Sequence, residues 1–265
     1  MSAGVKVEPA SRWVVAAKAV VVPALALAAL EWYARSIGFS DSIAPPSKAA
    51  AELASSLVDG TLLEATAFTL HAAGLGLGIG GGLGLLLGLL LGLNPRAAKA
   101  AFFSIEVFRP IPSVALIPLA MLVFGFGVDM EASIVAFATF WPMAILTQAA
   151  VRQVEPRLLE VATVLGLSTP ARLWKIVLPA IVPRLFVALR PGVGVALVVA
   201  VTVEIAANPH GLGFGLSMAQ QSLRPALMLG WLFWIACIGF ALNAAALALQ
   251  AAVGRRMGVA PEASR

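Results

Sequence analysis

The side chains that most often carry chemistry in proteins are scarce in this sequence and lie far apart. It contains two histidines, His71 and His210, one cysteine, Cys237, and one tyrosine. No H-E-x-x-H pattern and no nucleophile elbow occurs, and the two histidines are too isolated to form a metal site. Cys237 lies in an apolar run and has no partner for a disulfide within the chain. We therefore expect neither a metal centre nor a nucleophilic active site.

One motif formally suggests dinucleotide binding, and we interpret this match as accidental. Residues 76–81 match the dinucleotide fingerprint G-x-G-x-x-G, but no strand precedes them and no acidic partner follows. The phosphate-binding pattern G-x-x-x-x-G-K-[ST] is absent from the sequence. A different explanation fits the same segment. Glycines recur there at every fourth position, which lets a second helix approach closely; they are Gly76, Gly80, Gly84 and Gly88.

Few charged residues fall within or beside the apolar stretches, and each has two interpretations. Glu204 is either a gate or pathway carboxylate or an anchor satisfied by a partner, and we favour the anchor. Glu106 and Arg109 are three residues apart and are expected to pair on one helical face. Arg109 could instead face a transport pathway, where it would attract an anion. The sequence leaves this choice open.

Composition identifies the surroundings that must position these residues. Of 265 residues, 60% are hydrophobic and 12% charged, whereas soluble domains carry about 25% charged residues. Six apolar stretches approach the roughly 20 residues needed to cross a bilayer as a helix. We predict an all-α polytopic membrane protein with a single domain, residues 1–265, and spans at about 13–32, 66–91, 104–126, 132–150, 186–206 and 226–249. The first is interpreted as a retained span, not a cleaved signal.

The basic residues predict the orientation. With both termini in the cytoplasm, most cations fall in the connections at 92–103 and 151–185 or near the termini. Only Arg35, Lys48 and Arg224 remain outside. The net charge of +5 is thus attributed to cytoplasmic loops, not to nucleic-acid binding. The outer connection 38–64 is expected to carry a short helix.

The connection 151–185 has the pattern of two short helices. Pro156 suits the first turn of a helix and Gly166 a left-handed end. Between them an apolar stripe consists of Leu158, Leu159, Ala162 and Leu165. A second helix is expected from Thr169, with Pro179 and Pro183 ending it before the fifth span. The stripe suits a groove on a partner protein, or it packs against its own bundle, and both interpretations stay open.

Several motifs together resemble those of binding-protein-dependent ABC importer permeases. Glu160-Val-Ala162, Gly166 and Ile176-Val-Leu178-Pro179 resemble the EAA motif, which in that family also lies between the fourth and fifth spans. Val161 stands where the consensus has alanine. The segment from Arg109 to Gly127 resembles the nitrate/sulfonate/taurine (bicarbonate) branch. The resemblance covers about residues 12–253, and the EAA-type loop is its most specific part.

This resemblance implies a type I importer permease fold and a transport subunit that is not itself an enzyme. It implies that Glu160, Ala162, Gly166, Leu178 and Pro179 belong to a coupling loop that docks on an ATPase. The expected partners are ATP-binding cassette ATPase subunits, a periplasmic solute-binding protein, a second permease copy and the lipid bilayer. No cofactor is expected on this chain, with ATP and Mg held by the ATPase.

Two other functions remain as alternatives at this stage. A self-sufficient ion-coupled carrier or channel would transport without an ATPase. A membrane enzyme would need a convergent polar cluster, which the sequence does not suggest. The expected substrate is a small anion such as a sulfonate, taurine, nitrate or bicarbonate. A pyrimidine precursor or another small organic molecule is the alternative substrate.

Overall fold

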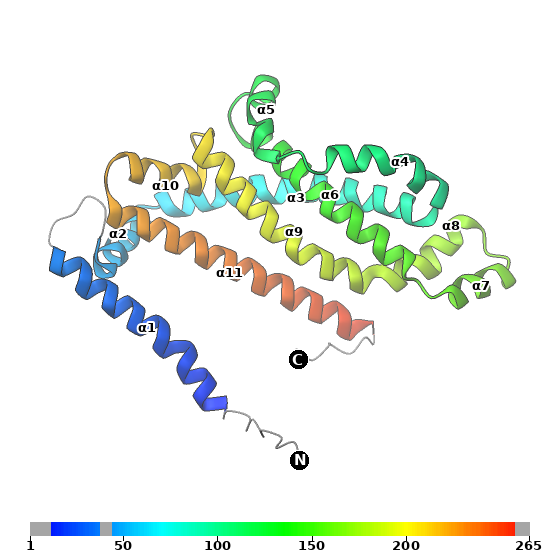
Figure 1. Ribbon diagram of the computed structural model, residues 1–265, viewed down its shortest axis with the longest axis horizontal. Coiled ribbons are helices and arrows are strands. Elements are labelled where there is room, and N and C mark those ends of the chain that lie inside the picture. The colour runs from blue at the N-terminus through cyan, green and yellow to red at the C-terminus, as the bar shows by residue number, and fades with distance from the viewer. Residues whose placement is uncertain (1–11, 38–43, 258–265) are drawn as a thin grey trace, which may run out of the picture.

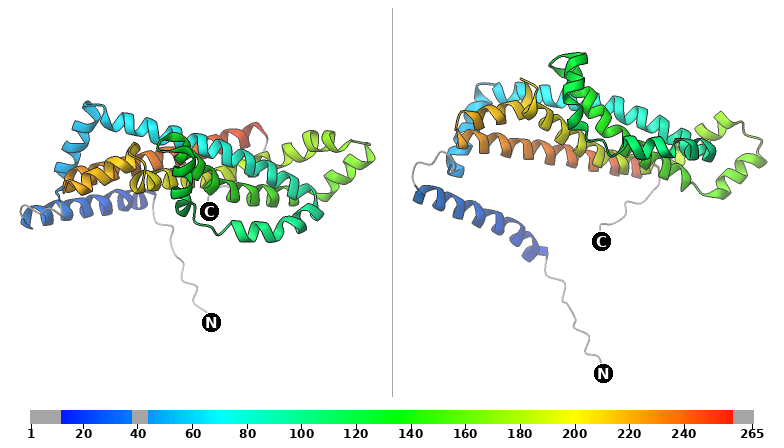
Figure 2. Two further views of the ribbon diagram at one scale, coloured as in Figure 1. Left: turned by 90° about the horizontal axis from the view of Figure 1, so that it is seen from above. Right: turned by 45° about the horizontal axis from the view of Figure 1, so that its top comes forward.

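The computed structural model describes residues 12–37 and 44–257, and every regular element within them is helical. Helices α3, α6, α9 and α11 run side by side along the molecule and α1 diverges from them, while α7 and α8 extend beyond one end and α10 and α2 lie at the other (Figures 1 and 2). The elements are α1 (Arg12–Ile37), α2 (Pro46–Val58), α3 (Thr61–Leu93), α4 (Pro95–Phe108), η1 (Ser113–Leu116), α5 (Ile117–Phe124), α6 (Val128–Arg152), α7 (Pro156–Val164), α8 (Thr169–Arg172), η2 (Leu173–Val177), α9 (Leu178–Ala206), α10 (Gly211–Gln221) and α11 (Pro225–Arg256).

Length and apolar composition identify the helices that can cross a membrane. Within the described residues four qualify: α3, α6, the continuous helix from Pro170 to Ala206, and α11. A fifth is formed if α4 and the η1–α5 segment are counted as one bent span. Helix α1 covers the first expected span, 13–32. The all-helical class is confirmed, whereas the count of six spans is only partly matched by these helices.

The third expected span, 104–126, is not a single straight helix. Helix α4 ends at Phe108, and the chain bends by 78° before it continues through η1 and α5. Pro110 and Pro112 lie in the break. A proline lacks the N–H of a helical hydrogen bond and its ring crowds the preceding turn, so two prolines this close together favour a break after α4.

The expectation that Pro179 and Pro183 end a helix is wrong. The chain stays helical through both, and Pro191 also lies inside α9. Pro179 follows the π-helical turn η2 and occupies the first turn of α9, where a missing N–H is tolerated. In a membrane helix, neighbouring helices and local adjustments compensate for interior prolines such as Pro183.

Helices α3 and α6 approach each other closely, and glycine makes the approach possible. A methyl group on Gly76 would lie 2.5 Å from Val135 Cβ, and one on Gly88 would lie 2.5 Å from the carbonyl oxygen of Ala144. Gly80 and Gly84 face carbonyl oxygens of α6 in the same way. We call this contact the α3–α6 seam. The four-residue spacing of the glycines is the feature that allows it.

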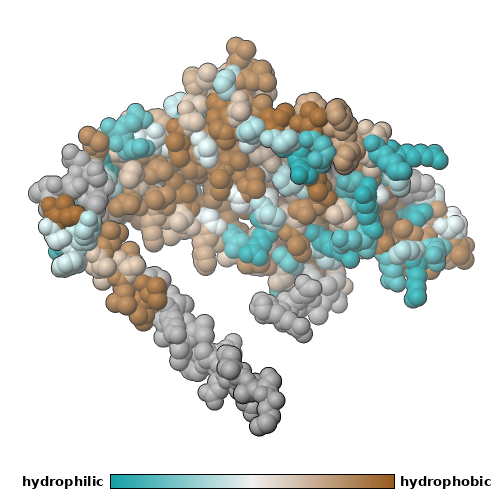
Figure 3. All heavy atoms as spheres, viewed as in Figure 1, coloured by the Kyte–Doolittle hydropathy of each residue, from teal (hydrophilic) through white to brown (hydrophobic). Residues whose placement is uncertain are grey.

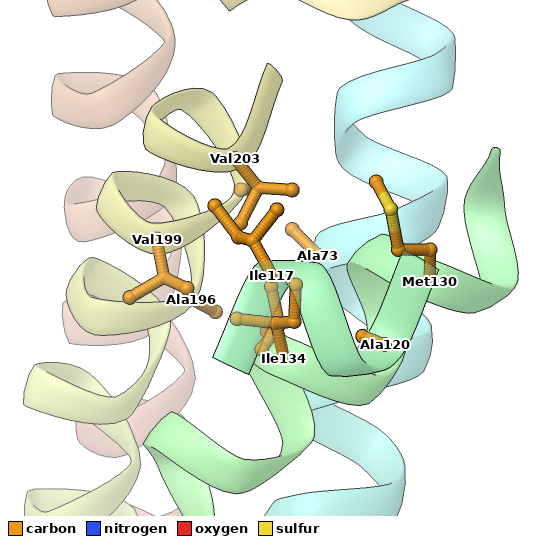
Figure 4. Packing of buried hydrophobic residues seen from close by; sticks show 10 residues of the cluster. Ala73, Ile117, Ala120, Met130, Ile134, Ala196, Val199 and Val203 are labelled. Atoms are coloured by element: carbon orange, nitrogen blue, oxygen red, sulfur yellow. The ribbon is translucent and has the colours of Figure 1, made fainter. Parts of the chain in front are cut away.

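A buried apolar cluster joins four segments near the middle of the molecule. Figure 4 shows Ala73, Ile117, Ile134 and Val203 pointing toward one another from α3, α5, α6 and α9. The surface over the long helices is mostly hydrophobic, and hydrophilic residues gather toward the end that carries α7 and α8 (Figure 3). An apolar exterior around a small-residue core is the arrangement that lipid requires.

Candidate functional site

The connection between α6 and α9 forms an elbow that extends beyond the bundle (Figure 1). We call residues 155–177 the α7 elbow. Pro156 begins α7, and Gly166 ends it with φ at +63°. The N–H of Leu167 donates to the carbonyl of Ala162, and that of Gly166 to Thr163, both at 3.0 Å. This is the Schellman arrangement, which satisfies carbonyl groups left free at the helix end.

One side of the elbow is packed against the bundle. Ala162 is fully buried, and Leu159 and Leu178 pack against a cluster that contains Val151, Val177 and Ile181. Residues of α6, α7, η2 and α9 therefore pack together on the inward side of the elbow. It holds α7 in place instead of leaving it as a free loop.

The other side of α7 exposes apolar side chains. We define the elbow patch as Val161, Val164 and Leu165, which lie on the last turns of α7. All three are exposed, and the Val164 side chain reaches 87%. Glu160 and Pro179 are also exposed, beside this patch and at the start of α9. The expected stripe is thus divided: Leu159 and Ala162 face inward, whereas Leu158 and Leu165 face outward.

Val161 and Val164 were not predicted as surface residues. Their signal was available, because Leu158, Val161 and Leu165 are spaced three and seven apart and lie on one helical face. The structural role of Arg184 was also not predicted. Its guanidinium donates to the carbonyls of Gln153 at 3.1 Å and Ala150 at 3.4 Å. A cation on these last carbonyls stabilises the end of α6 and fixes the base of the elbow.

At the opposite end of the bundle, Glu204 is an anchor inside the protein. Its carboxylate accepts a hydrogen bond from the Thr69 hydroxyl at 2.6 Å and from the Gly213 N–H at 2.7 Å. Thr69 in turn accepts the N–H of Leu212 at 2.9 Å. Glu204 and Thr69 therefore cap the N-terminus of α10 from two other helices, where a negative charge is stabilised.

Two further residues of this buried cluster were missed. Asn208 donates to Glu131 at 2.8 Å and to the carbonyl of Gly127 at 3.3 Å, and both side chains are buried. The two residues are 77 positions apart, and no sequence period connects such a pair. Glu131 and Asp129 are both acidic residues in the first turn of α6.

Arg109 has different surroundings from Glu204. It lies at the end of α4, and its guanidinium is 3.4 Å from Glu106. Both side chains are about half exposed. The two candidate pathway residues thus have separate partners, and the expected Glu106–Arg109 pair forms.

A shallow hollow of about 340 Å³ opens between α2, α10 and α11. Glu52 and Arg224 line it and form an ion pair at 2.8 Å. Asp59 also lines it and accepts hydrogen bonds from the hydroxyl and N–H of Thr61, at 2.7 and 2.9 Å. These bonds lower the pKa of the exposed Asp59 carboxyl. No group of three or more His, Cys, Asp or Glu side chains within the described ranges is placed to hold a metal ion.

The sequence of this bundle matches a known family of transport proteins. Residues 80–259, which include most of the seam, the whole elbow and Glu204, match the model of "Binding-protein-dependent transport system inner membrane component". The chain belongs to this family. Its members are permease components of binding-protein-dependent transporters, so the α7 elbow and the bundle are parts of a permease.

Curated relatives include permeases named for taurine and for nitrate. The permease is 34% identical over 146 residues to the taurine transport system permease protein TauC of Escherichia coli, which covers 55% of this chain and 53% of that one. It is 27% identical over 139 residues to the nitrate import permease protein NrtB of Leptolyngbya laminosa, or 52% of this chain and 50% of that one. The chain spans about half the length of the curated relatives that it matches.

Solved structures support the fold independently. The inward-facing MetNI methionine ABC transporter aligns with a TM-score of 0.66 at 18% identity, covering 74% of this chain and 97% of that chain. An amino acid ABC transporter determined with histidines aligns with a TM-score of 0.58 at 20% identity, covering 77% and 97%. At these identities the likeness establishes the fold, which is that of ABC importer permeases.

Proposed function

We propose that this permease imports a small solute by alternating access, driven by a separate ATPase that docks on the α7 elbow. The observation that carries this proposal is the divided surface of α7. One side is held against α6 and α9, and the other exposes an apolar patch at the end of the molecule. An apolar helical face on a rigid support is suited to insertion into a groove of a partner.

The residues of the EAA-like motif take different parts in this docking. Glu160, Pro179 and the elbow patch are exposed and are assigned to the ATPase contact. Ala162 and Leu178 face the bundle and position α7. Gly166 sets the turn that follows the helix. ATP and Mg would be bound by the ATPase, and this chain would hold neither.

The substrate class that we propose is a small anion such as taurine, another sulfonate, nitrate or bicarbonate. The names of the relatives support it, since they include taurine and nitrate permeases. A pyrimidine precursor or another small organic molecule is the alternative. We further propose that a periplasmic binding protein delivers the solute and that two copies of the permease form the pathway. We see no internal repeat in the sequence, as carriers that form a pathway alone often have.

In the proposed orientation the α7 elbow and both termini lie in the cytoplasm. The cations of the elbow region support this choice: Arg152, Arg157, Arg172, Lys175 and Arg184. The orientation can be measured by replacing Val164 or Val58 with cysteine in a chain that lacks Cys237. An impermeant maleimide added to intact cells should label position 58 and not position 164. Labelling in the opposite pattern would overturn the orientation.

Val164→Asp tests the docking directly, with Val58→Asp as its matched control. Val164 is 87% exposed and Val58 is 90% exposed at the other end of the bundle, so neither change disturbs the packed interior. The permease should be co-expressed with an ATP-binding cassette ATPase from the same organism and purified through a tag on the permease. Val164→Asp is expected to lose the ATPase at least tenfold, while Val58→Asp retains it. Equal retention by both variants would refute docking through the elbow patch.

Transport in liposomes tests the energy source. The permease alone should not move radiolabelled taurine, sulfonate or nitrate, and the complex with ATPase and binding protein should do so only with internal ATP. Uptake by the permease alone along an ion gradient would instead establish a self-sufficient carrier.

A further inference from the structure

Two glutamates meet inside the bundle, near the N-terminus of α10. Glu131 of α6 is 0% exposed and Glu204 of α9 is 1% exposed. Their carboxyl groups lie within hydrogen-bonding reach of each other. Two negative charges at this separation in a water-poor interior would repel each other strongly, so the pair must be neutralised in part.

The hydrogen bonds around the pair show which member holds the charge. Both oxygens of Glu204 accept a bond, one from the Thr69 hydroxyl and one from the Gly213 N–H. Gly213 lies in the first turn of α10, an eleven-residue helix whose positive end faces the carboxylate. Glu204 thus has the donors that an ionised carboxylate requires.

Glu131 has a different set of contacts. Its Oε2 accepts the amide of Asn208 at 2.8 Å, which a neutral carboxylic acid also does through its carbonyl oxygen. Its Oε1 is buried and receives no hydrogen bond from the described residues. A buried oxygen that receives no hydrogen bond can carry the hydroxyl of a protonated acid, which donates instead of accepting.

A metal ion fits the same oxygens poorly. Glu131 Oε1 and Asn208 Oδ1 are the buried side-chain oxygens of this cluster left without a hydrogen bond in the part of the chain that the structure describes. Mg²⁺ takes about six oxygen ligands and Ca²⁺ about six to eight. Two unused oxygens provide too few, whereas one proton needs only a donor oxygen and an acceptor.

We propose that Glu131 is a proton-binding site and donates its proton to Glu204, forming a carboxylic acid–carboxylate hydrogen bond between α6 and α9. Charge-assisted O–H···O⁻ bonds are short and stronger than neutral ones. The bond joins residues 73 positions apart and adds to the Asn208 bond from the same glutamate. Glu131, Glu204, Asn208 and Thr69 then form one network that connects α3, α6, α9 and α10 at this end of the permease. The inference does not depend on the transported solute or on the ATPase.

Isosteric variants of the full-length permease separate the two roles. Glu131→Gln keeps a donor toward Glu204 and an acceptor for Asn208, so its Tm should stay within about 2 °C of the wild type. Glu204→Gln removes the charge and turns an amide toward existing donors, which should lower Tm by about 5 °C or more. Equal losses, or a larger loss for Glu131→Gln, would overturn the proposal.

Infrared spectroscopy of the purified permease provides a readout that packing alone would not change. The wild type at neutral pH should show the carbonyl stretch of a buried protonated carboxylic acid, and Glu131→Gln should lose that band. Absence of the band from the wild type contradicts the proposal even if neither variant folds. A Tm that rises when Na⁺, Mg²⁺ or Ca²⁺ is added to the wild type, but not to Glu131→Gln, would identify a cation site instead.

Discussion

Along the α3–α6 seam the backbone of one helix lies directly against the next, whereas on the α7 elbow apolar side chains project away from the chain. In the seam the useful property of Gly80 or Gly84 is the missing side chain. On the elbow the useful property of Val164 is an exposed side chain that no described residue covers. The residues of the seam therefore suit a contact within the protein, and those of the elbow patch suit a contact with another protein. Substitutions in the first should change folding, and those in the second should change association.

The largest effect is expected in the seam. A methyl group at Gly80 would overlap the carbonyl oxygen of Ala136, and the helices would have to separate. Gly80→Ala should cost about 1–3 kcal/mol of unfolding free energy, as overpacking does elsewhere. Gly78→Ala is the control, because nothing lies within 4 Å of the added atom and alanine improves helix stability by about 0.5–1 kcal/mol. Thermal unfolding in detergent measures both, and a seam variant as stable as the control would remove the contrast.

A smaller effect is expected at the base of the elbow. Arg184→Met removes the donors to the carbonyls of Ala150 and Gln153. Because the Arg184 side chain is exposed, solvent competes for these bonds and we expect a loss of no more than about 1 kcal/mol. Hydrogen exchange should rise in residues 150–168 and stay unchanged in α3. Arg157→Met is the control, since Arg157 is exposed and makes no hydrogen bond to the described residues. Unchanged exchange in the Arg184 variant would show that apolar packing alone anchors the elbow.

Gly166 tests the turn of the elbow without changing its packing. A side chain there meets nothing within 4 Å, but the φ of +63° is unfavourable for most residues. Gly166→Ala should cost about 1–2 kcal/mol of local stability, and Gly166→Asn less, because asparagine tolerates this region. The measurement is ATPase co-purification together with hydrogen exchange of α7. If the two variants behave alike, backbone strain at this position is not what maintains the elbow.

The smallest effect is expected for the Glu52–Arg224 pair, which gives a baseline for both regions. Its side chains are 35% and 53% exposed. Arg224→Ala should lower the unfolding free energy by less than about 1 kcal/mol, because water and salt screen exposed pairs. The small loss should disappear in 1 M salt, where the screening length is about 3 Å. A loss as large as that of Gly80→Ala would show that this surface contact is structural.

Local patterns in the sequence predicted much of this fold. The glycine spacing of α3 indicated the seam, and Pro156 and Gly166 marked the helix that became α7. Four apolar stretches correspond to long helices because hydrophobic length is a local property. Pro110 and Pro112 indicated a break after Phe108, but a straight span was predicted there. Pro179 and Pro183 were expected to end a helix, and the helix continues through them.

The buried carboxyl cluster was beyond such patterns. Glu204 could be singled out because it is charged and lies in an apolar run, but its partners Thr69 and Gly213 come from other elements. Glu131 and Asn208 are joined only after α6 and α9 have packed together. Polar contacts between distant segments depend on the three-dimensional arrangement, so helical periodicity in the sequence does not predict them.

The continuous helix from Pro170 to Ala206 has a mechanical consequence. Its 37 residues correspond to a rod of about 55 Å at the usual helical rise. It begins within the elbow and reaches Glu204 without passing through a loop. A displacement of the elbow end would therefore be transmitted through the helix to the end that carries Glu204. Pro179, Pro183 and Pro191 lie within this helix and each lacks a backbone N–H, so the helix should bend most easily near these prolines.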